Sequence, residues 1–132
     1  MAPKRVLIVE DNHDTRTIYS MILRHVGYET AEALHGEEGV RKARERPPDL
    51  ILMDLSMPVL DGWGANEQLK ADPRTASIPV VMVTAHSGLV TPKSAREAGF
   101  ASLLLKPVET RRLVELVETM IGPPPGATAG PA

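Results

Sequence analysis

The sequence predicts a single α/β domain built on a five-stranded parallel sheet, with helices covering both faces to give three layers. Two observations support this fold class. Short apolar segments alternate with helical ones five times along the chain, which is the pattern of repeated strand–helix crossover units. The runs at residues 6–9 and 50–53 are also unbroken, as is typical of strands buried on both faces of a parallel sheet.

Composition narrows the class of protein. A chain of 132 residues with 42% hydrophobic residues has room for one domain with a real core. The net charge of −2 gives no basic excess for nucleic acid or an anionic membrane surface, and the lack of cysteine excludes disulfides and thiolate metal sites. No apolar run approaches the length of a membrane span or a signal-peptide core. We expect a cytoplasmic protein with no direct nucleic-acid contact and no membrane insertion.

The first half of the chain supplies clear helix signals. Asn12 or Asp14 can cap a helix that runs to about residue 26, where Gly27 is a natural stop. Three aliphatic residues spaced four apart predict the core face of this helix: Ile18, Ile22 and Val26. An edge strand over 28–33 and a charged surface helix over 36–46 follow. The inward residues of that second helix are expected to be Val40 and Ala43.

The second half repeats the alternation. A helix is expected to begin near Asp61 or Gly62 and to end at about Ala71, and strands are expected at 80–83 and 103–105. Thr91 followed by proline marks the start of a short helix that a glycine, Gly99, closes. The last helix has the clearest amphipathic pattern, with apolar residues at Leu113, Leu116, Val117, Met120 and Ile121.

The chain ends in a segment of different composition. Residues 122–132 consist almost entirely of proline, glycine and alanine, which cannot build a core. We therefore predict a folded domain over 1–121 and a disordered tail or linker stub over 122–132. The composition fits a natural terminus and a linker to a further domain equally well.

Polar residues follow four of the five predicted strands. They are Glu10 and Asp11, Asp54, Thr84 and Lys106. Any one of them alone would more often be a helix cap or a turn former. In a parallel sheet, however, the carboxyl ends of the strands lie along one edge, where open α/β sheets bind their ligands. The joint placement therefore predicts a functional site with three carboxylates, a hydroxyl and an ammonium group.

Charge indicates the chemistry of this site. Two carboxylates about 4 Å apart repel each other by roughly 4 kcal/mol at an effective dielectric constant near ~20. A hard divalent cation together with Lys106 would balance the three negative charges, and Mg²⁺ suits all-oxygen ligands while leaving positions for a phosphate oxygen. A magnesium ion beside a lysine is suited to phosphoryl transfer, with one carboxylate as the nucleophile. Thr84 can donate a hydrogen bond to a phosphoryl oxygen.

These residues and their surroundings also resemble a known family. The pair Glu10-Asp11, Asp54 with Met57-Pro58 and Asp61-Gly62, Thr84-Ala85 and Lys106-Pro107 together resemble the full signature of the response-regulator receiver domain. The resemblance covers roughly residues 4–121 and points to the CheY-like superfamily of two-component phosphorelay signalling. It implies a flavodoxin-like (βα)5 fold with strand order 2-1-3-4-5.

The resemblance implies roles at the acidic positions. Asp54 would accept a phosphoryl group from a phosphohistidine on a sensor histidine kinase or a histidine phosphotransfer protein. Asp11, Asp54 and the backbone carbonyl of Ser56 would bind Mg²⁺, or Mn²⁺ as an alternative ion. Glu10 would act on the metal mostly through a bound water. The protein would not be an enzyme beyond its own phosphorylation and autodephosphorylation.

The resemblance also implies a switch. Lys106 would pair with Asp54 and then with the phosphoryl group, while Thr84 would move towards that group. The change would reach a downstream protein through the face of the fourth helix, fifth strand and fifth helix, with a phosphorylation-dependent dimer as one outcome. Leu103 departs from the family, which usually has an aromatic residue or histidine there. It either packs under the fourth helix, which we favour, or belongs to an apolar docking patch.

Other functions fit less well. Two interpretations as a receiver domain stay open: a module without an output domain, or the amino-terminal part of a longer regulator. A hydrolase or phosphotransferase for small molecules lacks a second substrate loop and a separate general base. A receiver that only binds partners is disfavoured because every site position is filled. A zinc hydrolase is disfavoured because the four histidines have no close-spaced ligand motif: His13, His25, His35 and His86.

Overall fold

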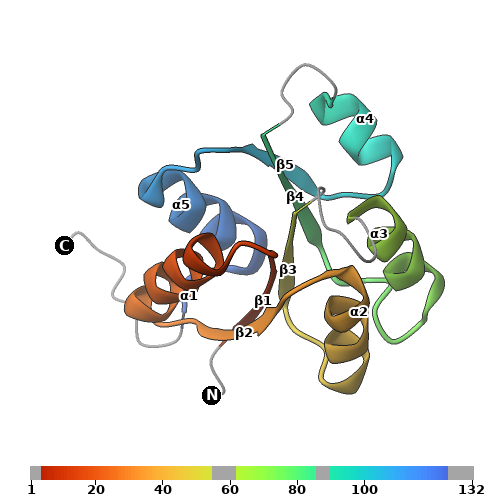
Figure 1. The fold of residues 1–132 in the computed structure, drawn as a ribbon, viewed down its shortest axis with the longest axis horizontal. Helices are drawn as coiled ribbons and strands as arrows, with labels where there is room; N and C mark the ends of the chain where they lie inside the picture. Colours follow the sequence, from red (N-terminus) through yellow and green to blue (C-terminus); the bar gives the residue numbers. More distant parts are fainter. Residues whose placement is uncertain (1–3, 55–61, 86–89, 125–132) are drawn as a thin grey trace.

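The computed structural model describes residues 4–54, 62–85 and 90–124. The strands are β1 (Arg5–Val9), β2 (Glu29–Ala33), β3 (Leu50–Asp54), β4 (Val80–Thr84) and β5 (Ser102–Leu105). The helices are α1 (His13–Val26), α2 (Gly36–Glu45), α3 (Gly62–Ala71), α4 (Pro92–Glu97) and α5 (Thr110–Ile121). All strand pairs are parallel and the sheet order is β2-β1-β3-β4-β5, which confirms the predicted fold (Figure 1).

The sheet separates two apolar clusters. Alternate residues of β1 point to opposite faces, so that Val6 and Ile8 join one cluster while Leu7 and Val9 join the other. Helices α1 and α5 cover the first cluster, and α2, α3 and α4 cover the second (Figure 1). Because both faces are covered, β3 and β4 are buried along their whole length, as their apolar sequences predict.

Helix α1 begins and ends where the sequence indicates, but its core face is rotated. The Asn12 side chain accepts a hydrogen bond from the Thr15 N–H, and Gly27 ends the helix with a φ of 113°. Ile18, predicted to face the core, is 53% exposed, whereas Tyr19 and Leu23 are buried. A step of four residues turns about 40° beyond a full circle, so a stripe at that spacing drifts off the core face. The predicted Ile22 and Val26 lie at its margin, partly buried.

A glycine brings α2 close to the sheet. A Cβ atom on Gly39 would lie 2.8 Å from the Cγ2 of Val9, a distance that real side chains do not tolerate. The predicted inward residues of the helix, Val40 and Ala43, are both buried. Helix α2 therefore packs directly against the end of β1 that precedes the acidic residues.

The first residues of the predicted tail contact the domain. The Tyr28 hydroxyl donates a hydrogen bond of 2.7 Å to the Gly122 carbonyl, and Pro124 is buried beside Gly27. Residues 125–132 lie outside the described part of the chain. None of the described helices is long and apolar enough to cross a membrane.

Candidate functional site

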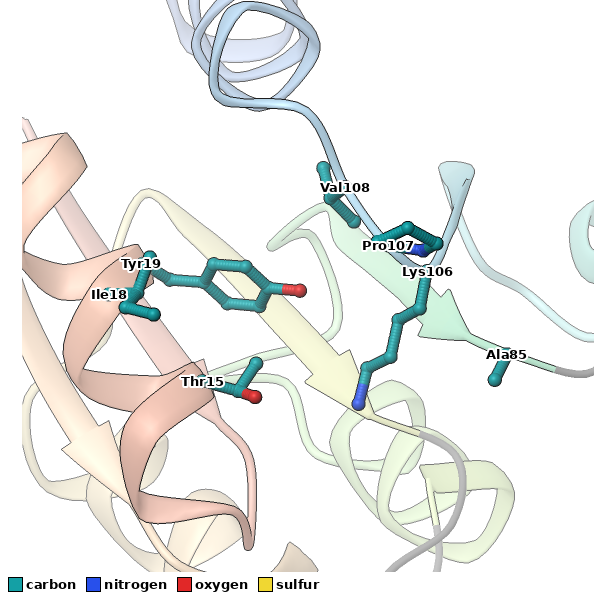
Figure 2. Close-up of a pocket in the computed structure, with 7 residues that line it drawn as sticks. All are labelled: Thr15, Ile18, Tyr19, Ala85, Lys106, Pro107 and Val108. Carbon is teal, nitrogen blue, oxygen red and sulfur yellow. The ribbon is translucent and has the colours of Figure 1, made fainter.

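The carboxyl edge of the sheet assembles the predicted polar residues. Asp54 and Thr84 are the last residues of β3 and β4, and both are buried. Glu10 follows β1 and is only 2% exposed, while the neighbouring Asp11 is exposed. Figure 2 shows the Lys106 side chain extending from the segment after β5 toward the carboxyl end of β3. The topology thus brings four separate chain segments to one site.

Three carboxylates form the centre of this site. Glu10, Asp11 and Asp54 each offer one oxygen, and these three atoms lie within 4.8 Å of one another. Such a set of oxygen donors fits a hard cation, because Mg²⁺ is bound by one or two carboxylates and keeps several waters. The spacing and donor chemistry therefore fit the magnesium site that the sequence predicts.

Lys106 contacts two of the three acids, and the contacts are unequal. Its Nζ lies 2.8 Å from Glu10 Oε1 and 3.5 Å from Asp54 Oδ2. The resemblance implies pairing with Asp54, but the shorter ion pair is with Glu10. Partial burial works against the charged form of Lys106, yet the hydrogen bond and charge of Glu10, with the charge of Asp54, outweigh it and raise the lysine pKa. The ammonium group therefore stays protonated in the site.

The remaining groups of Glu10 are also occupied. Its Oε2 accepts a hydrogen bond of 3.2 Å from the Asn12 N–H, and its own N–H donates to the Ala33 carbonyl at 3.1 Å. Partial desolvation raises the pKa of the Asp11 carboxyl, and its hydrogen bond and charge repulsion with Glu10 raise it further. Glu10 is thus held by several contacts, and a bound cation would favour the charged form of Asp11.

Arg16 is a site neighbour that the sequence analysis missed. Its guanidinium lies behind the acidic cluster and donates to the Glu10 carbonyl at 2.8 Å. A signal was present, because Arg16 lies three and seven residues before Tyr19 and Leu23 and hence on the buried face of α1. A buried basic residue must find partners, and those of Arg16 are the Glu10 carbonyl, the Glu32 carboxylate and the His13 ring.

A hollow of about 420 Å³ adjoins Lys106. Figure 2 shows the side chains around it, and its walls come from α1, the end of β4 and the segment after β5: Thr15, Ile18, Tyr19, Ala85, Lys106, Pro107 and Val108. The exposed Ile18, which the four-residue spacing wrongly placed on the core face of α1, lines this hollow instead. A largely apolar hollow thus adjoins the lysine of the charged site.

Several predicted positions lie outside the described residues. They are Ser56, with its proposed carbonyl ligand, Met57-Pro58, Asp61 and His86. Two other histidines have structural contacts, since His35 caps α2 and His13 lies 3.1 Å from an Arg16 nitrogen. In the described ranges the potential metal cluster contains carboxylates alone, so a zinc site built from histidines finds no support.

Leu103 lies partly buried beneath α4. It packs against the cluster that includes Val90, Ala95 and Phe100. This is the packing role that the sequence analysis favours for the residue. Its register partner on β4 is Met82, whereas the buried Thr84 is paired with Leu105.

Comparison with known proteins agrees with this geometry. Residues 6–118 match the family model of the response regulator receiver domain. The chain is 35% identical over 120 residues to the polar-differentiation response regulator DivK of Brucella anthropi, covering 91% of this chain and 98% of that protein.

Solved structures show the same likeness. The receiver domain of the sensor histidine kinase PA1611 from Pseudomonas aeruginosa, with a magnesium ion coordinated in its active site cleft, matches with a TM-score of 0.84. It is 31% identical, and the match covers 92% of this chain and 99% of that one. The chemotaxis protein CheY4 of Vibrio cholerae matches with a TM-score of 0.82 and 26% identity, covering 90% and 99% of the two chains.

The fold and the acidic edge define a signalling domain that works through phosphorylation. The chain belongs to the response regulator receiver-domain family of two-component systems. Receiver domains bind Mg²⁺ at an acidic pocket of this kind, and they interact with histidine kinases or phosphotransfer proteins and with downstream effectors.

Proposed function

We propose that Asp54 is the phosphoacceptor of this receiver domain. The observation that carries the proposal is its position, at the buried end of β3, within 4.8 Å of two further carboxylates and 3.5 Å from the Lys106 ammonium. An oxygen of the Asp54 carboxylate attacks the phosphorus of a phosphohistidine. The P–O bond forms as the P–N bond breaks, and the electron pair stays on the imidazole nitrogen, which takes a proton from water.

The surrounding residues hold the charges that this transfer creates. Asp11, Asp54 and the carbonyl of Ser56 would hold Mg²⁺, or Mn²⁺ as an alternative, with Glu10 acting through water. The bound ion would neutralise negative charge on the phosphoryl oxygens. Lys106 moves from its carboxylate partners to a phosphoryl oxygen, and the Thr84 hydroxyl donates to another. Autodephosphorylation reverses the state, as water attacks phosphorus and the P–O bond to Asp54 breaks.

The donor is a sensor histidine kinase or a histidine phosphotransfer protein in the cytoplasm, where the domain is proposed to reside. The output face is proposed to be α4, β5 and α5. Leu105 of β5 is 46% exposed there, and a hollow of about 300 Å³ lies beside it, bordered by Leu103, Pro107 and Arg112 among others. An exposed apolar side chain next to a hollow suits a protein partner, or a second phosphorylated copy.

The test is intact-mass analysis after incubation with a small phosphoryl donor. Wild-type protein with Mg²⁺ is expected to gain one acid-stable, base-labile phosphoryl group, whereas Asp54→Asn protein and metal-free protein gain none. Circular dichroism of Asp54→Asn should match the wild type, because the amide is isosteric with the acid. Stoichiometric labelling of Asp54→Asn at another residue would refute the assignment. If the wild type gains nothing, a purified phosphohistidine protein serves as the donor, and failure with both overturns the proposal.

A further inference from the structure

Arg16 is a buried charge whose guanidinium makes three separate contacts. The residue is 6% exposed. Its Nη1 donates to the Glu10 carbonyl at 2.8 Å, its Nε lies 3.1 Å from Glu32 Oε1 on β2, and its Nη2 lies 3.1 Å from the His13 ring. The fixed fork of a guanidinium can satisfy several partners at once, which a lysine cannot do.

The Glu10 carbonyl belongs to the peptide that joins Glu10 to Asp11. Fixing this carbonyl therefore fixes the plane from which the Asp11 side chain departs. Glu10 has further supports of its own, in Lys106 and Asn12. Asp11 is exposed, so its aim depends on the backbone more than that of Glu10 does.

We propose that Arg16 is a positioning residue for magnesium: its guanidinium, held by Glu32, fixes the Glu10–Asp11 peptide so that the Asp11 carboxylate faces Asp54. The inference rests on the proposed metal site. Magnesium demands near-ideal octahedral geometry, so a site whose ligand is not held in position binds Mg²⁺ less tightly even when its charge is unchanged. Residues that orient metal ligands without touching the metal typically change metal affinity by about 10–100-fold when replaced.

A purely electrostatic effect of Arg16 and a positioning role predict opposite changes in Mg²⁺ affinity for the same substitution. Arg16→Met removes a positive charge near the cation, so electrostatics alone would tighten Mg²⁺ binding. The same change removes the donor to the Glu10 carbonyl, so a positioning role predicts weaker binding. Arg16→Lys keeps the positive charge but loses the rigid guanidinium with its several donors, so only the positioning role predicts weaker Mg²⁺ binding by that variant.

The experiment is a calorimetric Mg²⁺ titration of wild-type, Arg16→Met and Arg16→Lys protein well below the unfolding temperature. Arg24→Met is the matched control, because Arg24 is an exposed arginine of the same helix. Arg16→Met is expected to raise the Kd for Mg²⁺ about tenfold or more, and Arg16→Lys several-fold. Arg24→Met is expected to leave the Kd within about twofold, because exposed charges are largely screened. The rise in Tm on adding Mg²⁺ should shrink in the same order.

The outcomes separate this inference from the metal site itself. If Arg16→Met and Arg16→Lys lower the Tm but bind Mg²⁺ as tightly as the wild type, the role of Arg16 is structural and the inference is overturned. Tighter binding by Arg16→Met overturns it as well. Asp11→Asn reports on the site: if it binds Mg²⁺ as the wild type does, the proposed metal site fails instead. Should Arg16→Met not fold, Arg16→Lys alone decides the question.

Discussion

The corner between β1 and α1 and the segment around α4 both follow the carboxyl end of a strand, yet they are held differently. At the corner, Glu10 is bound at both carboxylate oxygens, at its carbonyl and at its N–H, by four different residues. Helix α4 has six residues, of which Ala95 alone is buried. A capping box stabilises its first turn, and Asn66 on α3 donates one hydrogen bond to the carbonyl at its end.

The functions proposed for the two regions would account for this difference. A metal and phosphoryl site gains from ligands that are held in place before the reaction. A segment that reports the reaction must change its population at a cost that one phosphoryl group can supply, so it has to be lightly held. The receiver domain therefore combines a rigid corner with a lightly anchored helix on one scaffold.

Replacing Lys106 should produce the largest effect, because it removes a cation from the rigid corner. In metal-free Lys106→Ala, Glu10 is left buried beside Asp54 without its partner, at a cost of about 2–3 kcal/mol in the free energy of unfolding. Because folding raises the pKa of Lys106, its ion pairs contribute their full stabilisation below pH ~10.4, the pKa of a free lysine. That stabilisation is lost as the pH rises through the folded-state pKa. Urea unfolding at pH 7 and above pH ~10.4 measures both effects.

Lys93→Ala is the control for this prediction, since Lys93 is an exposed lysine of α4. Its unfolding free energy should stay within about 0.5 kcal/mol of the wild type. We expect Lys106→Ala to bind Mg²⁺ still and to recover part of its stability with it, while phosphorylation no longer reaches the output. A Lys106→Ala protein that signals normally would show that the role given to this lysine is wrong.

A change at Asn66 should have an intermediate effect and should act on α4. The buried Asn66 side chain donates a hydrogen bond of 2.9 Å to the Ala98 carbonyl at the end of that helix. Asn66→Ala is expected to cost about 1–2 kcal/mol. Hydrogen exchange should quicken over residues 92–98, while Mg²⁺ affinity stays unchanged. Gln68→Ala, on the exposed side of α3, is the control; equal exchange rates in both variants would contradict the anchoring role.

The sequence predicted more of the rigid corner than of the lightly held side. Strand ends could be read from apolar runs that stop at a charge, so Glu10, Asp54 and Lys106 were placed correctly at one edge. The preference of Lys106 for Glu10 over Asp54 could not be read, because both acids follow neighbouring strands. It depends on side-chain reach within the folded site, which strand order does not specify.

Errors arose where one helical face had to be chosen. Ile18 fits a four-residue stripe, yet it lies beside the hollow near Lys106, because the core face of α1 is centred on Tyr19 and Leu23. The burial of Arg16 was missed because a charged residue on a surface helix is normally exposed. The burial is explained only by its partners, Glu10 after β1 and Glu32 on β2, which are distant in sequence from one another.

The smallest effect is expected from the N-cap of α4. The Thr91 hydroxyl accepts a hydrogen bond of 3.0 Å from the Ser94 N–H, and the Ser94 hydroxyl accepts one from the Thr91 N–H, also at 3.0 Å. Thr91→Ala removes a cap worth about 1 kcal/mol to the helix. Because α4 is lightly held, we expect it to fray locally while global stability changes by less than about 0.5 kcal/mol. Faster exchange at residues 92–98, with Thr91→Ser as the matched control, would show this. A global loss as large as that of Lys106→Ala would instead mean that α4 is held as firmly as the corner at Glu10.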